Sequence, residues 1–128
     1  MPESYRQAGP PFAQNGNKTT IRLLKNVQLK NSLNVTAGKN IVFNLQNFTL
    51  SNGTGCEQII KNNGTLEIIG GSNGKIQTNA AYGAIDNNPT GNLKISSGKI
   101  ITTGERQAIY NAGGNVEVTG TAYLSTNA

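Results

Sequence analysis

The sequence predicts an all-β solenoid, in which short strands wind around one axis and each coil stacks on the next. The main evidence is a four-residue box that occurs three times, as Ile59-Ile60-Lys61-Asn62, Ala84-Ile85-Asp86-Asn87 and Ala108-Ile109-Tyr110-Asn111. The last two copies are 24 residues apart. A fixed period in the low twenties, with short strands between Gly and Asn, is typical of solenoids, because one coil cannot bury its inner face alone.

Composition supports strands rather than helices. Only 35% of the residues are hydrophobic and 5% are aromatic, with 16 glycines and no Trp. Ile, Val, Thr and Leu alternate with polar residues at period two, which favours strands. A chain of 128 residues is long enough for one domain with a modest core and too short for two.

The chain divides into an N-terminal arm, residues 1–18, and a solenoid domain, residues 19–128. The arm contains Pro2, Pro10 and Pro11 among polar residues and shows no alternation. We expect it to be flexible, or to be exchanged with a neighbouring molecule. Its apolar side chains Tyr5 and Phe12 are the candidate anchors for assembly.

The repeats predict inward columns of aliphatic side chains. Aligning the short strands gives one column of Phe43, Leu66, Leu93 and Val116, and a second of Leu45, Ile68, Ile95 and Val118. The residues between them face outward and are Asn44, Glu67, Lys94 and Glu117. The alternation of charge between neighbouring coils favours parallel, in-register stacking.

A ladder of asparagines is predicted at one corner. Asn62, Asn87 and Asn111 end the three copies of the box, where the chain must turn. Asn tolerates the left-handed backbone conformation, and its amide can bond the amide of the next coil. The alternative is a row of amides that binds a ligand.

Residues 20–27, 41–50 and 108–111 resemble the right-handed parallel β-helix repeats of bacterial extracellular and surface proteins of the pectin-lyase-like class. The resemblance covers residues 20–124 and implies a single-stranded right-handed parallel β-helix, for which we expect about five coils. It also implies an extracellular or cell-surface location. The class contains lyases, hydrolases, phage tailspikes and inert stalks, so it implies a fold and not an activity.

The acidic residues argue against catalysis. A β-helix lyase needs carboxylates that hold Ca²⁺ and a base, and a hydrolase needs two or three converging carboxylates. The chain has six acids, no two of them adjacent, and no His: Glu3, Glu57, Glu67, Asp86, Glu105 and Glu117. We therefore expect no enzyme activity, no catalytic residue, no cofactor and no metal site.

Charge and cysteine usage narrow the partners. The net charge is +5, but the basic residues are scattered without a run, so we expect no nucleic-acid binding. No segment approaches the roughly 18 apolar residues of a membrane span, so we expect no membrane insertion. The single cysteine, Cys56, is either a buried thiol or an intermolecular link.

Two non-catalytic functions remain. In the first, the chain is a structural subunit that stacks head to tail on copies of itself, forming a filament or surface stalk. In the second, it is an adhesive module that binds acidic or neutral polysaccharide through an outer face of Lys61, Tyr82, Arg106 and Tyr110. A fragment of a polysaccharide lyase, hydrolase or phage tailspike is the least favoured alternative.

Overall fold

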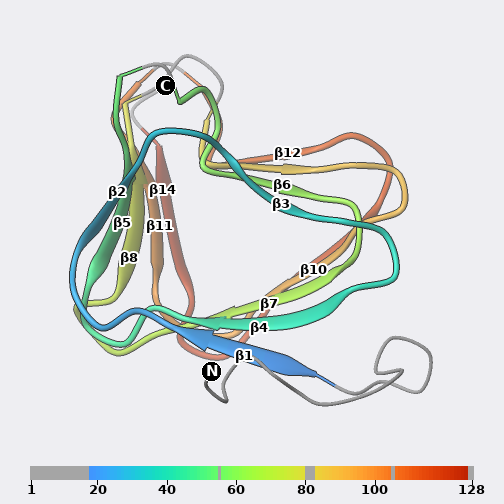
Figure 1. The fold of residues 1–128 in the computed structure, drawn as a ribbon, viewed down its shortest axis with the longest axis horizontal. Coiled ribbons are helices and arrows are strands. Elements are labelled where there is room, and N and C mark those ends of the chain that lie inside the picture. Colours follow the sequence, from blue (N-terminus) through green and yellow to red (C-terminus); the bar gives the residue numbers. More distant parts are fainter. Residues whose placement is uncertain (1–17, 55, 80–82, 105, 127–128) are drawn as a thin grey trace.

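The structure is a right-handed, single-stranded parallel β-helix. It is a computed structural model that describes residues 18–54, 56–79, 83–104 and 106–126. These residues form strands and turns and contain no helix. In each coil the chain runs along three sides, which are labelled β1, β2 and β3 for the first coil in Figure 1. Parallel strands joined by right-handed crossovers are the strongly preferred arrangement.

Three parallel sheets make up the three sides, and we call them sheets A, B and C. Sheet A contains β1 (Thr19–Arg22), β4 (Asn40–Asn44), β7 (Thr65–Ile69), β10 (Asn92–Ile95) and β13 (Asn115–Val118). Sheet B contains β2 (Val27–Leu29), β5 (Thr49–Asn52), β8 (Lys75–Thr78), β11 (Lys99–Thr102) and β14 (Tyr123–Thr126). Sheet C contains β3 (Leu33–Val35), β6 (Ile60–Asn62), β9 (Ile85–Asn87) and β12 (Ile109–Asn111). The described strands thus form four complete coils and two sides of a fifth.

The predicted columns are confirmed for the last three coils of sheet A. Leu66 pairs with Leu93 and Leu93 with Val116, while Ile68, Ile95 and Val118 form the second column. Between the columns, Lys94 pairs with Glu67 on one side and Glu117 on the other. The period-two pattern therefore fixes both the inward face and the register here.

The predicted columns are wrong at β4, where the register is two residues earlier. Ile41 pairs with Leu66, Val42 with Glu67 and Phe43 with Ile68. Phe43 therefore lies in the column of Ile68 rather than that of Leu66, and Leu45 lies beyond the paired strand. Val42, and not Asn44, lies in the outward row of Glu67. The run 41–45 offers three alternate apolar positions for two inward places, and periodicity does not choose between them.

The turn after β4 explains the choice. Leu45 lies beyond the strand and is fully buried in the corner, where its N–H donates to the carbonyl of Ile69 over 2.8 Å. Gln46 follows with a φ of 54°, a left-handed conformation that is uncommon outside Gly. The Oδ1 atom of Asn44 accepts a hydrogen bond from the N–H of Gln46 over 2.9 Å, which stabilises this turn.

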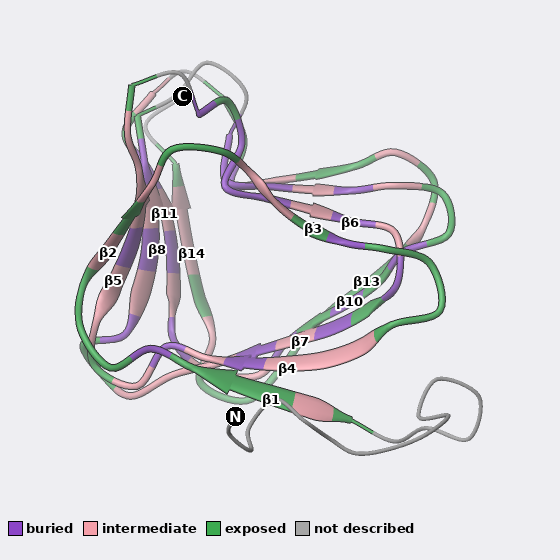
Figure 2. Ribbon diagram, in the orientation of Figure 1, coloured by how far each residue is buried: buried purple, intermediate pink, exposed green. Residues whose placement is uncertain are grey.

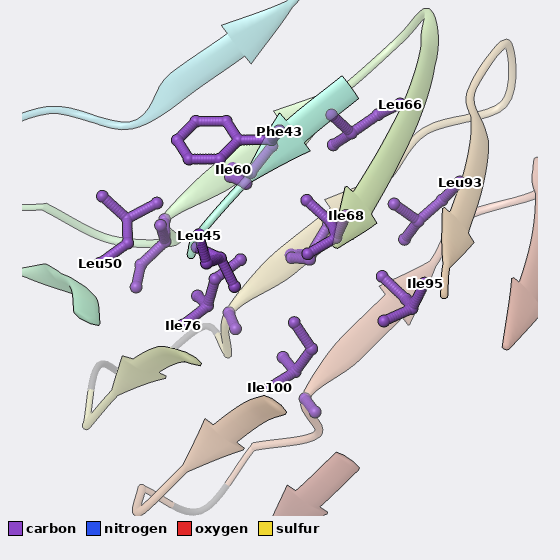
Figure 3. Close-up of a cluster of buried hydrophobic side chains, with 14 of the residues drawn as sticks. Phe43, Leu45, Leu50, Ile60, Leu66, Ile68, Ile76, Leu93, Ile95 and Ile100 are labelled. Carbon is purple, nitrogen blue, oxygen red and sulfur yellow. The ribbon is translucent and has the colours of Figure 1, made fainter. Parts of the chain in front are cut away.

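The core is a stack of aliphatic side chains inside the coils. Figure 3 shows Leu and Ile side chains from the three sheets pointing towards one another, with Phe43 at the first-coil end of the cluster. The residues that are fully buried include Leu45, Ile59, Ile68, Ile76, Ile85, Ile95 and Ile100. Cys56 is also buried, as a free thiol with Sγ 3.5 Å from the carbonyl oxygen of Gln58.

Candidate assembly interface: the two ends of the solenoid

The predicted asparagines lie in one column at the corner between sheets C and A. Asn62 pairs with Asn87, and Asn87 with Asn111. The Nδ2 atom of Asn62 donates to Oδ1 of Asn87 over 2.9 Å, and Nδ2 of Asn87 donates to Oδ1 of Asn111 over 3.0 Å. Asn62 and Asn87 are completely buried. Because their amides are enclosed and occupied, they offer no row of ligand-binding groups.

The asparagines stabilise the corner through the hydrogen bonds of their side chains rather than through their backbone conformation. The Oδ1 atom of Asn62 accepts from the N–H of Gly64 over 3.2 Å. The Nδ2 atom of Asn87 also lies 3.2 Å from the carbonyl oxygen of Gly91 and 3.1 Å from that of Asn115. Gln46 is the residue other than Gly with a positive φ among those described, so the three asparagines do not use the left-handed conformation that Asn tolerates.

Glycines allow the coils to approach at the same corner. A Cβ atom at Gly91 would lie 2.6 Å from the carbonyl oxygen of Asn62, and one at Gly114 would lie 2.5 Å from that of Asn88. Real Cβ atoms do not approach oxygen so closely. These glycines are thus required by the packing of one corner on the next.

The first-coil end of the solenoid is open. Ile21 in β1 is 39% exposed, whereas Phe43, its neighbour in the same column, is 6% exposed. A cavity of about 420 Å³ opens between sheets A and C at this end. Its lining is mainly apolar and includes Ile21, Leu33, Val35, Ile41, Phe43 and Leu66.

At the last-coil end, inward side chains are likewise exposed. In sheet A, Val116 is 37% and Val118 is 49% exposed, whereas Leu93 and Ile95 above them are 2% and 0% exposed. Figure 2 shows this as the exposed colouring of β1 and β13, with buried residues in the strands between them. The inward pattern of the sequence continues to both ends, but the coil that would cover it is not among the described residues.

The predicted glycan face is brought together only in part. Lys61, Asp86 and Tyr110 lie in one outward column of sheet C, so an acid separates the cation from the aromatic ring. The Nε2 atom of Gln58 donates to the carboxylate of Asp86. Arg106 is exposed in the turn before β12. Tyr82, like the predicted anchors Tyr5 and Phe12, lies outside the described residues.

The acids of the described chain are dispersed. Glu67 accepts from the hydroxyl of Ser96 over 2.7 Å and lies 3.8 Å from Nζ of Lys18. Across the described ranges, no three His, Cys, Asp or Glu side chains are grouped as metal ligands would be. No helix in this part of the chain has the length and apolar character needed to cross a membrane.

Sequence reasoning missed three features. Asn92 and Asn115 form a second, exposed amide pair, in which Nδ2 of Asn115 donates to Oδ1 of Asn92 over 2.9 Å. Their equal position at the start of two aligned strands could have signalled it. The cavity at the first coil lies where β1 and β3 form the edges of sheets A and C, and the divergent sequence of the first coil concealed it. Tyr123, which is 53% exposed, lies in the outward row of Lys75 and Lys99.

No family model, no curated protein and no solved structure matches this chain.

Proposed function

We propose that the protein is a non-catalytic structural subunit whose solenoid ends stack on copies of itself. The observation that carries the proposal is the exposure of the last member of each inward column. Val118 is 49% exposed while Ile95, one coil away in the same column, is completely buried. A further coil placed on β13 would bury Val116 and Val118 as Leu93 and Ile95 are buried.

The two ends are complementary in register. Thr19 and Ile21 hold the same rows of sheet A as Val116 and Val118, because each strand of the sheet pairs with the next in parallel. In sheet B, Val27 holds the row of Leu124. A second copy placed with β1 on β13 and β2 on β14 would therefore continue the rows without a change of direction. Such a head-to-tail contact is heterologous and extends into a filament.

Edge pairing gives the contact its specificity. End strands present backbone N–H and C=O groups that can pair with another chain, and many proteins protect them with Pro, charge or a covering segment. β13 carries a single charged side chain, Glu117, and it faces outward. The row that would meet it from a second copy is that of Thr20, which is neutral.

The stacking is tested with a pair of variants on one strand. Val118→Glu places a charge on the inward column at the end, whereas Asn115→Glu adds the same charge to the outward face of β13. We expect light scattering of the parent chain and of the Asn115 variant to rise with concentration as filaments form, and that of the Val118 variant to stay at the monomer value. Parent protein that remains monomeric at millimolar concentration would overturn the proposal.

We further propose that this subunit acts outside the cell, as part of a filament or surface stalk, and belongs with the pectin-lyase-like β-helices of bacterial surface proteins. The support is the parallel β-helix together with the repeat boxes that resemble that class. Secretion of the chain by its source cell, followed by protease treatment of intact cells, tests the location. Protein that remains protected inside the cells would contradict it.

The proposed subunit does not degrade polysaccharide. Its carboxylates are dispersed, and Asp86 lies between Lys61 and Tyr110 rather than beside a second acid. We expect no depolymerisation of pectin or alginate, with or without Ca²⁺, in an assay for new reducing or unsaturated ends. Activity that is lost in Asp86→Asn would show that a catalytic site exists.

Binding of acidic or neutral polysaccharide is the alternative function. It has less support, because the outward column of sheet C alternates a cation, an acid and an aromatic ring. Retention of the monomer on a glycan column, with loss of retention in Lys61→Ala and Tyr110→Ala, would favour the adhesive module over the filament subunit.

A further inference from the structure

Sheet B differs from the other two sheets in the charges of its outward side chains. In sheet A, Lys94 lies between two glutamates, and in sheet C an aspartate follows Lys61 in the outward row. In sheet B, which forms one side of the coil in Figure 1, Lys75 pairs with Lys99, and the five described strands contain no acid. The outward face of sheet B therefore carries positive charge that the sheet itself does not balance.

The two lysines of this face are neighbours without an acidic partner. They occupy paired positions on adjacent strands, which lie about 4.8 Å apart. Like charges in directly paired positions destabilise a sheet. In the described part of the chain the ion pair is that of Lys18 with Glu67, so neither Lys75 nor Lys99 is neutralised there. An anion from outside the chain would relieve the repulsion between them.

Two hollows lie along the row of these lysines. One, of about 500 Å³, is next to Lys75 and is lined mainly by amides and hydroxyls, including the amides of Gln28 and Gln77. The other, of about 380 Å³, is next to Lys99 and Tyr123, where glycines leave room at the corner between sheets A and B. Tyr123 follows Lys99 in the row and is 53% exposed. Cations, hydrogen-bonding groups and an aromatic ring thus lie together along the solenoid axis.

We propose that the outward face of sheet B binds a sulfated polysaccharide that runs along the solenoid axis. Sulfate groups of neighbouring sugars contact the ammonium groups of Lys75 and Lys99. A sugar ring packs on the exposed ring of Tyr123, whose apolar face and polar hydroxyl suit a surface that is partly wet. The amides of Gln28 and Gln77 bond the sugar hydroxyls, since an amide both donates and accepts hydrogen bonds.

The side chains of the row favour this polymer over other polyanions. An ammonium group is a compact charge with three donors, which suits a tetrahedral oxyanion such as sulfate. The planar fork that binds a carboxylate at two points belongs to arginine, which the described strands of sheet B lack. Nucleic acids are bound through many phosphate contacts, and two cations supply few of them. The inference does not rest on filament formation, because the whole row lies within one chain.

Binding to dextran sulfate tests the proposal with two double variants of equal net charge. Lys75→Gln with Lys99→Gln removes the cations of the row, whereas Lys61→Gln with Lys94→Gln removes two cations from the other sheets. Affinity is measured by calorimetric titration of dilute protein at about 0.1 M salt. We expect the first variant to lose affinity about 25-fold, or about fivefold for each lysine, and the second about twofold or less, because distant charges are screened.

An equal loss of affinity in the two double variants would show attraction by net charge alone, and would overturn the proposal. Tighter binding to polygalacturonate, which carries carboxylates, than to dextran sulfate would overturn the choice of a sulfated polymer. We expect no measurable binding to unsulfated dextran. A parent chain that binds both dextrans equally, or neither of them, would also overturn the proposal.

Thermal unfolding separates binding from a structural role of the lysines. Lys75→Gln relieves the repulsion with Lys99, so its midpoint without ligand should equal or exceed that of the parent chain. Dextran sulfate should raise the midpoint of the parent chain, because a ligand of the folded state stabilises it, and should raise that of the Lys75 and Lys99 double variant much less. A ligand-free midpoint of Lys75→Gln below that of the parent would assign the lysine a structural role and contradict the proposal.

Discussion

Asn87 makes the most hydrogen bonds of the ladder, and those to Asn62 and Gly91 are buried. Its amide bonds the side chains of Asn62 and Asn111 and the carbonyl oxygens of Gly91 and Asn115. Asn87→Ala would leave the Nδ2 atom of Asn62 with the carbonyl oxygen of Asn92, 3.3 Å away, but without its Oδ1 partner. A buried polar group that loses a hydrogen-bond partner costs about 1–3 kcal/mol. We expect a loss of about 2 kcal/mol in the free energy of unfolding, measured by urea denaturation.

The control for this change is Asn111→Ala at the end of the ladder. Asn111 is exposed and its Nδ2 atom donates to the carbonyl of Gly114 over 2.9 Å. Water can replace these bonds, so we expect a loss below about 1 kcal/mol. Equal effects of the two substitutions would show that burial does not set the strength of the ladder.

Gly91 gives a second prediction at the residue scale. The methyl group of Gly91→Ala would press on the carbonyl oxygen of Asn62 and on the amide of Asn87. Overpacking of this kind costs about 1–3 kcal/mol of stability. We therefore expect the thermal midpoint of the variant to be lower than that of the parent chain. Thr90→Ala, at the preceding residue, removes one exposed hydrogen bond to the carbonyl of Asn63 and should change the midpoint much less. If Gly91→Ala left the thermal midpoint unchanged, the coils at this corner would be able to move apart to accommodate the methyl group.

At the scale of the strands, position along the column decides how much a side chain contributes. Ile95 and Val118 have the same inward orientation, yet one is covered by coils on both sides and the other on one side. Ile95→Ala should therefore cost about 2–5 kcal/mol, whereas Val118→Ala should cost less than about 1 kcal/mol in the monomer. The free energy of unfolding should be measured in dilute solution, where the protein is monomeric. Similar losses of stability for the two variants would mean that Val118 is covered at the end of the column.

The strands show how far the sequence determines the fold. Where the box repeats, as in residues 59–62, 84–87 and 108–111, period and polarity fix both the strand and its register. At β4 the same reasoning placed Phe43 two residues out of register, because the run 41–45 offers three alternate apolar positions for two inward places and the choice depends on the turn at Gln46. Tertiary packing of Leu45 in the corner, which leaves no periodic signal, determined the result.

The candidate site was predictable to a different degree. The asparagine ladder follows from the repeated box, and its amides are joined in the predicted column. The exposure of the end strands cannot be predicted from their own sequence. Val116 and Val118 alternate with polar residues in the same way as the buried Leu93 and Ile95. It depends on the number of coils that stack beyond them, which only the assembled structure supplies.

At the scale of the whole molecule, the solenoid is a set of similar coils with two complementary ends. The exposed members of its columns, Ile21 at one end and Val118 at the other, lie in the same row. Salt should have little influence on their contact, since the inward rows that meet carry no charge and the charged Glu117 would face the neutral Thr20. We expect assembly to persist at 1 M salt, where charge attraction is screened beyond about 3 Å, as measured by sedimentation. Dissociation at this salt concentration would indicate an electrostatic contact instead.

End-to-end stacking is tested most directly by cryo-electron microscopy of the full chain at high concentration. Strands in register rise by about 4.8 Å per coil, so a filament built from five-stranded sheets should have a subunit repeat of about 24 Å along its axis. The predicted result is a filament with both spacings, whose formation Val118→Glu prevents and Asn115→Glu does not. Filaments with a different axial repeat, or particles that remain single at every concentration, would contradict assembly through the solenoid ends.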